Sequence, residues 1–198
     1  MFFEAIVIGL AIGFLREGRL TNIQEINFRG WYLIIIALLL QISPTVFAKF
    51  NVLENSYNYI VFGASLLMLL GLLINLDKRG FWIIAIGALM NLIVIGLNGF
   101  AMPVHLSVLE GAGLGNFGQS IADGSVLNYV GFENFENILN YLGKFIVIPK
   151  PYPVPRIISI GDILISLGLL RFVQGEMNRP FFVRGSKMIQ YSYKAGRK

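Results

Sequence analysis

Two apolar stretches of the sequence carry polar residues at spacings that place them on one face of a helix. Asn91 and Asn98 are seven residues apart, and Asp162 and Ser166 are four residues apart, so each pair lies on nearly the same helix face. A carboxylate and amides that converge in an apolar protein can hold a cation or a small ligand, and Asp162 can act as a general base. The same groups can instead form hydrogen bonds between helices, without any ligand.

Six polar residues are expected at a similar level of the molecule, within or beside its apolar segments. They are Glu4, Gln41, Asn91, Asn98, Ser159 and Asp162. We interpret them as a candidate polar site that opens toward the outside of the cell. The sequence predicts no catalytic residue set, no metal site and no cofactor, because it contains no nucleotide-binding loop or zinc motif and a lone histidine cannot build a metal centre.

The segment Ser159-Ile160-Gly161-Asp162 also has a purely structural interpretation. It fits the capping box of a helix start, in which Ser159 accepts hydrogen bonds from free amides and Asp162 reaches back to the chain before the helix. A hydrolase that uses two carboxylates would need a second acid near Asp162. Glu4 and Asp123 are the only plausible partners in the sequence, and neither has a diagnostic spacing.

Other short motifs predict turns and close helix contacts. Asn98-Gly99 predicts a left-handed cap at the end of a helix, and Met102-Pro103 then turns the chain. A stripe of small residues in the first apolar run lets another helix approach closely; it consists of Ala5, Gly9 and Gly13. We expect this stripe to pack within the chain, with dimerisation as the alternative.

The composition indicates the kind of protein that must position these residues. Of the 198 residues, 56% are hydrophobic and 14% are charged, whereas soluble domains contain about 45–50% and about 25%. The mean hydropathy is +0.69. These values exclude a disordered chain, a nucleic-acid-binding domain and an ordinary soluble enzyme. The chain contains no cysteine, so it has neither disulfides nor thiolate chemistry.

Five apolar runs alternate with short charged segments. They cover residues 2–15, 31–47, 57–76, 81–97 and 157–173. A helix that crosses the hydrocarbon core needs about 20 residues, with a lower limit near 17, so the first run is short for a span, and the fifth is interrupted by Asp162 and Arg171. The acidic Glu4 near the start of the first run favours a retained helix over a cleaved signal peptide.

The distribution of charge predicts the direction of these helices. The net charge is +5, from 16 Lys and Arg against 11 Asp and Glu. If the N-terminus lies outside, the cytoplasmic side receives 12 of the 16 basic residues, as expected from the excess of basic residues in cytoplasmic loops. The fold class is therefore predicted to be an all-α membrane protein with about five transmembrane helices, an outer N-terminus and a cytoplasmic C-terminus.

The domain organisation follows from this topology. Residues 1–175 are expected to form the transmembrane bundle, with residues 98–156 as an extracytoplasmic loop, and residues 176–198 a basic cytoplasmic tail. Apolar residues recur at helical spacing over residues 132–145, which predicts an amphipathic helix within the long loop.

The motifs in order resemble a family of small bacterial integral-membrane proteins that is classed as a domain of unknown function. Asn98-Gly99 with Met102-Pro103-Val104, and Ser159-Ile160-Gly161-Asp162, carry this resemblance. It implies a bacterial cytoplasmic membrane and no established activity. The family tends to have a glycine where Phe100 stands and an aspartate where Lys144 stands. If that aspartate is a ligand or a catalytic acid, this chain lacks it.

The function expected from the sequence is that of a non-catalytic protein of the bacterial cytoplasmic membrane. It would lie in the lipid bilayer and bind a partner subunit or a small ligand at its outer face, with a homodimer as one form of partner and no role for nucleic acid. Two alternatives stay open. One is a transport component with an outward polar cavity, and the other is a membrane-embedded hydrolase that uses Asp162, by a faint similarity to lipoprotein signal peptidases.

Overall fold

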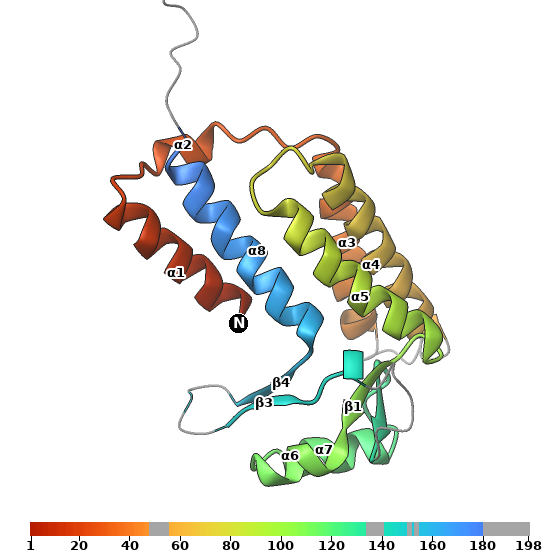
Figure 1. Ribbon diagram of the computed structural model, residues 1–198. Helices are drawn as coiled ribbons and strands as arrows, with labels where there is room; N and C mark the ends of the chain where they lie inside the picture. Colours follow the sequence, from red (N-terminus) through yellow and green to blue (C-terminus); the bar gives the residue numbers. More distant parts are fainter. Residues whose placement is uncertain (48–55, 134–140, 150–151, 153–154, 180–198) are drawn as a thin grey trace, which may run out of the picture.

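The computed structural model describes residues 1–47, 56–133, 141–149, 152 and 155–179. In chain order its elements are α1 (Phe2–Leu15), α2 (Thr21–Gln24), α3 (Trp31–Phe47), α4 (Tyr57–Ile74), α5 (Phe81–Leu97), β1 (Met102–His105), α6 (Leu106–Gly111), α7 (Gly115–Ala122), β2 (Tyr129–Phe132), β3 (Ile146–Ile148), β4 (Arg156–Ile158) and α8 (Ile160–Met177). The expected helical bundle is confirmed as a mostly helical protein (Figure 1).

Five long helices form the bundle, and they correspond to the five apolar runs of the sequence. Each packs against its neighbour in the order α1, α8, α5, α4 and α3 (Figure 1). Helix α8 begins at Ile160, because residues 156–158 form β4 instead. Within the described residues, only α4 is both long and apolar enough to cross a membrane, while the apolar helices that begin at Phe2, Trp31 and Phe81 are shorter.

Glycines allow the central helices to approach closely. A Cβ atom on Gly87 of α5 would lie 2.5 Å from the carbonyl oxygen of Gly161 in α8, and one on Gly168 would lie 2.9 Å from that of Gly80. The small-residue stripe of α1 faces α8 in the same way, since a Cβ on Gly9 would lie 3.0 Å from the carbonyl oxygen of Leu170. The expectation that this stripe packs within the chain is therefore confirmed.

Two buried asparagines hold the end of the bundle at which α2 lies. Asn75, which follows α4, donates to the carbonyl oxygens of Arg29 and Gly71 at 2.7 and 2.8 Å and accepts from the Arg29 amide at 2.8 Å. Asn22 of α2 donates to the carbonyl oxygen of Met177 at 2.8 Å. These bonds connect the loops to the helix ends, where backbone carbonyls otherwise lack partners.

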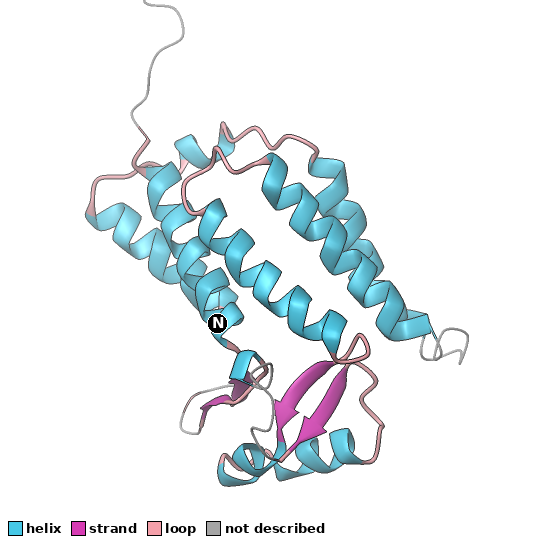
Figure 2. Cartoon of the chain, turned by 45° about the vertical axis from the view of Figure 1, so that its right-hand side comes forward, coloured by secondary structure: helices cyan, strands magenta, loops and turns pink. Residues whose placement is uncertain are grey.

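The opposite end of the bundle carries a small mixed structure, which we call the cap. It comprises β1, β2, β3, β4, α6 and α7 (Figure 2). Strands β1 and β2 are parallel, with Met102 opposite Tyr129, and β3 and β4 are antiparallel, with Ile146 opposite Ile158. The buried side chains of Val104, Leu109, Ile121 and Ile157 form its core.

The all-α expectation is therefore wrong for the segment between α5 and α8. The predicted amphipathic helix is also wrong at both ends, because Phe132 closes β2 and Phe145 immediately precedes β3. Residues 134–140, in the middle of that prediction, lie outside the described residues. At Phe132 the helical spacing of apolar residues did not produce a helix. Pairing with β1 satisfies the backbone amides and carbonyls of β2 in an extended conformation instead.

Candidate functional site

The start of α8 forms the capping box that the sequence predicts. The hydroxyl of Ser159 accepts a hydrogen bond from the backbone amide of Asp162 at 3.0 Å, and Oδ2 of Asp162 accepts one from the amide of Ser159 at 3.1 Å. Ser159 is fully buried. The structural role of both residues is thus confirmed, and one carboxylate oxygen of Asp162 already has a partner.

Asn91 connects this helix start to the middle of α5. Its side-chain amide donates to Oδ1 of Asp162 at 3.0 Å, and its carbonyl oxygen accepts from the hydroxyl of Ser159 at 2.8 Å. Gly161 makes room for these bonds, because a Cβ atom there would lie 2.2 Å from Oδ1 of Asn91. The structure therefore brings together Asn91, Ser159 and Asp162, three of the six residues expected to form the site.

Lys144 completes the group from the cap. Its ammonium lies 3.6 Å from Oδ2 of Asp162 and 5.4 Å from the centre of the Tyr129 ring. The backbone of Lys144 is fixed against β1, since its amide donates to Pro103 at 2.8 Å and its carbonyl oxygen accepts from the His105 amide at 3.0 Å. The side chains of Lys144 and Asp162 are 19% and 13% exposed, so this ion pair is largely shielded from solvent.

Two hollows meet at this ion pair. The first, which we call the polar cavity after its four charged side chains, has a volume of about 870 Å³. The charged side chains are Glu4, Lys144, Arg156 and Asp162, and most of the other lining residues, such as Phe2, Leu114 and Phe117, are apolar. The second, the apolar groove, has a volume of about 990 Å³ and is lined by side chains from all five long helices. The lining of both hollows includes Phe2, Tyr129, Lys144 and Asp162. Because all five helices line one groove, their row is curved and the groove lies on its inner side.

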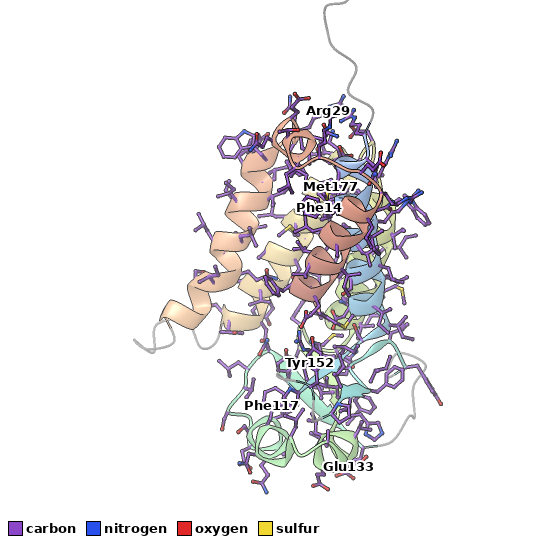
Figure 3. All side chains as sticks on the ribbon, turned by 90° about the vertical axis from the view of Figure 1, so that its left-hand side faces the viewer. Phe14, Arg29, Phe117, Glu133, Tyr152 and Met177 are labelled. Atoms are coloured by element: carbon purple, nitrogen blue, oxygen red, sulfur yellow. The ribbon has the colours of Figure 1, made fainter. Side chains whose placement is uncertain are left out.

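Glu4 lines the polar cavity and is bound by Arg156 of β4 and by Tyr152, which lies between β3 and β4. Its carboxylate accepts hydrogen bonds from the hydroxyl of Tyr152 and, at 2.6 Å, from Nη2 of Arg156, and it pairs with the amino group of Met1. Figure 3 shows Tyr152 beside the cap, at the end opposite Arg29 and Met177. The hydrogen bond to the Glu4 carboxylate, with a contribution from desolvation, raises the pKa of the Tyr152 phenol above its usual value.

The other predicted residues take different positions. Gln41 lines the apolar groove. Asn98 donates to the carbonyl oxygen of Val94 on its own helix at 2.8 Å. Asn98 is seven residues beyond Asn91, so it lies about 10 Å farther along α5. This places Asn98 beyond the start of α8. Of the two asparagines of α5 that were expected at a similar level to Asp162, Asn91 therefore makes the hydrogen bond to it.

The predicted turn motifs after α5 are partly confirmed. Gly99 has a φ of +62°, and the Phe100 amide donates to the carbonyl oxygen of Ile95 at 2.9 Å, as in a left-handed helix cap. Met102 and Pro103, expected in a turn, instead form the buried first half of β1.

Comparison with known proteins places this chain in a family. The model of a family of unknown function, DUF5317, matches residues 25–174. The chain belongs to this family. A relative from Thermotoga maritima, described as an uncharacterized protein, is 28% identical over 173 residues, which cover 87% of this chain and 89% of the relative. No solved structure matches the chain.

The DUF5317 match includes the capping box, Asn91 and Lys144, whereas Glu4 and the rest of α1 precede it. Sequence reasoning did not select Lys144, Tyr129 or Arg156 as site residues. The sequence analysis noted Lys144 only because it stands where the family tends to have an aspartate. The spacing of residues along the sequence does not reveal Lys144, Tyr129 or Arg156, because they reach the site from strands and turns of the cap.

Proposed function

We propose that this DUF5317 protein is a multi-pass protein of the bacterial cytoplasmic membrane, with the five long helices crossing the bilayer. Helices α3, α4 and α5 contain no Asp, Glu, Lys or Arg. On α5 the exposed large side chains are all apolar and recur every three or four residues: Trp82, Ile86, Leu89, Ile93 and Leu97. In a water-soluble protein the exposed face of a helix is polar, so this stripe supports contact with lipid.

The orientation that we propose has the cap and the N-terminus outside the cell. The described basic residues Arg16, Arg19, Arg29, Lys78, Arg79 and Arg179 belong to the segments at the α2 end of the helices. Lys144 and Arg156 are on the cap side. The excess of basic residues at the α2 end supports a cytoplasmic position for that end.

Single cysteines test this topology, because the chain has no cysteine of its own. We expect cysteines at Ser120 in α7 and at Asn137 to react with a membrane-impermeant thiol reagent in intact cells. Cysteines at Gln24 in α2 and at Ser186 should react only after the cells are permeabilised. Asn137 and Ser186 lie outside the described residues. Labelling of Gln24 or Ser186 in intact cells would exclude the five-span arrangement.

We further propose that the protein binds a small ligand at the cap end, without catalysing a reaction on it. The observation that carries this proposal is the position of the Lys144–Asp162 ion pair at the meeting point of the polar cavity and the apolar groove. Ligand sites are concave and mostly apolar, with a few polar groups that fix orientation. A ligand with one polar end and one apolar part matches this arrangement.

The described contacts favour this function over the two alternatives. The partners of the Asp162 carboxylate are an amide side chain, a backbone amide and an ammonium group. Glu4 lines the same cavity, but its described contacts are with Tyr152, Arg156 and Met1, whereas a two-acid hydrolase needs both carboxylates at the reacting centre. Transport of a polar solute would need polar side chains along the groove deeper than Asn91. Ile84, Phe81 and Phe172, which line the groove on the α2 side of Asn91, are apolar, and the hydroxyl of Ser65, which also lines the groove, donates to Val61 on its own helix at 2.8 Å.

Filling the groove tests ligand binding. Ala88 of α5 lines the apolar groove, and Ala11 of α1 is exposed. Native mass spectrometry of protein purified in a mild detergent should detect a bound small molecule in the wild type and in Ala11→Phe, and should lose it in Ala88→Phe. Leu38→Trp fills the groove from α3 if Ala88→Phe does not fold. An unliganded wild type, or a ligand that survives both groove substitutions, would contradict the proposal.

A further inference from the structure

The carboxylates around the polar cavity already have donors. Asp162 accepts from Asn91 and from the Ser159 amide, and it lies at the positive end of α8, where a negative charge is stabilised. Glu4 accepts from Tyr152 and Arg156. Neither carboxylate therefore needs a cationic ligand, and the negative charge of Asp162 is largely compensated within the protein.

Lys144 has donor capacity left. Its ammonium carries three N–H donors, yet its contacts with the described residues are the ion pair at 3.6 Å and the face of Tyr129. A separation of 3.6 Å is too long for a hydrogen bond. Lys78, by comparison, bonds to Asp77 at 2.8 Å. The ammonium of Lys144 thus borders both hollows with its positive charge loosely paired, which suits an anionic oxygen of a ligand.

The apolar groove suits a flexible hydrocarbon chain better than another helix. Helices that approach closely in membranes use small residues at the contact, as α5 and α8 do here with Gly87 and Gly161. Among the described residues the groove lining contains no glycine, and its members include Phe28, Trp31 and Phe172. Bulky aromatic and branched side chains keep a partner helix at a distance, while a chain of methylene groups can adapt to them.

We propose, on the basis of the ligand-binding function above, that the ligand is a lipid-like amphiphile with a phosphate or carboxylate headgroup. The anionic oxygens bind the ammonium of Lys144 in the polar cavity. The hydrocarbon chain passes between Phe2 and Tyr129, which line both hollows, and lies in the apolar groove. Lys144 contributes the headgroup contact, and the inner face of the curved row of helices supplies the chain site.

Four probes separate the headgroup from the chain. Phosphatidylglycerol and oleate have both parts, diacylglycerol with the same acyl chains lacks the anionic group, and glycerol phosphate lacks the chain. Binding is measured by titration and native mass spectrometry on the full chain in an uncharged detergent. We expect both anionic amphiphiles to bind about tenfold or more tightly than diacylglycerol, as for a hydrogen bond to a charged group. Glycerol phosphate should bind far more weakly than phosphatidylglycerol.

Two lysine substitutions identify the headgroup contact. Lys144→Gln should lower the affinity for phosphatidylglycerol about tenfold, to the level of diacylglycerol, and Lys144→Arg should retain the preference. Lys78→Gln removes an equal charge from the other end of the bundle and should leave binding unchanged. Equal binding of phosphatidylglycerol and diacylglycerol, or full binding by Lys144→Gln, would overturn the headgroup assignment while leaving ligand binding intact. Absence of binding by all four probes, with a protein dimer in the mass spectrum, would overturn this inference and the proposed function together.

Discussion

The side-chain amide of Asn91 lies 3.0 Å from Oδ1 of Asp162 and joins the middle of α5 to the first turn of α8. The same residue accepts from Ser159 at 2.8 Å, so the amide uses its donor and its acceptor at once. A feature that caps one helix is thereby also a contact between two helices. Ser159 and Asp162 belong both to the capping box and to the candidate ligand site, so each of these residues has two roles.

Asn91→Ala tests this contact. The substitution leaves the Ser159 hydroxyl and Oδ1 of Asp162 without their partner, and an unsatisfied buried polar group costs about 1–3 kcal/mol. Asn98→Ala is the matched control, since it removes only a bond to the same helix. We expect thermal unfolding in detergent to show a larger loss for Asn91→Ala. Equal losses would mean that the bonds of Asn91 contribute nothing beyond helix propensity.

Gly161→Ala tests the close approach of α5 and α8. The added Cβ would lie 2.2 Å from Oδ1 of Asn91 and 2.7 Å from the carbonyl oxygen of Gly87, so the helices must move apart. We expect a loss of about 3 kcal/mol in the free energy of unfolding. Gly63→Ala, where a Cβ meets nothing within 4 Å, should instead gain about 0.5–1 kcal/mol. Both are measured by thermal unfolding, and a tolerated Gly161→Ala would contradict the packing.

Phe100 has a φ of +64°, a conformation that costs a residue with a Cβ about 1–2 kcal/mol. Its ring packs 4.9 Å from Tyr59 and 4.8 Å from Phe62, measured between ring centres. Phe100→Ala loses these contacts and keeps the strain, whereas Phe100→Gly loses the contacts and relieves it. We therefore expect the glycine variant to be more stable than the alanine variant by about 1 kcal/mol. The reverse order would show that the backbone here is not left-handed.

Tyr152→Phe tests the contact between α1 and the cap through its pH dependence. The hydrogen bond to Glu4 raises the pKa of the Tyr152 phenol, so folding favours the protonated form. This contribution is fully present below the ordinary tyrosine pKa of about 10 and is lost as the pH rises through the higher pKa of the folded protein. The wild type should exceed Tyr152→Phe in stability at neutral pH, and the difference should shrink above about pH 10.

Tyr59→Phe serves as the control for removal of a phenol, because Tyr59 is exposed and the phenol bonded to Glu4 is that of Tyr152. The stability of Tyr152→Phe is compared with that of this control and of the wild type at each pH. The measurement is chemical unfolding at a series of pH values. A difference between wild type and Tyr152→Phe that stays constant through the alkaline range would argue against the contact with Glu4.

The helices of the bundle and the capping box at the start of α8 were predictable from local patterns in the sequence. The apolar runs and the Ser159–Asp162 spacing are local signals, and a helix with its capping box forms mainly from residues that are near in sequence. The close contact made by the stripe that includes Gly9 and Gly13 was also predictable, since small residues spaced by four indicate a close helix contact wherever the partner helix lies.

The contacts between polar groups and the conformation of the long loop depend on residues far apart in the sequence. Asn91 rather than Asn98 reaches Asp162, because the relative shift of α5 and α8 is set by Gly87 against Gly161, a contact between distant parts of the chain. Lys144 reaches the site because β1 holds its backbone. Pairing between strands distant in sequence leaves no periodic trace in either segment, since it depends on register across the molecule and not on the order of neighbouring residues.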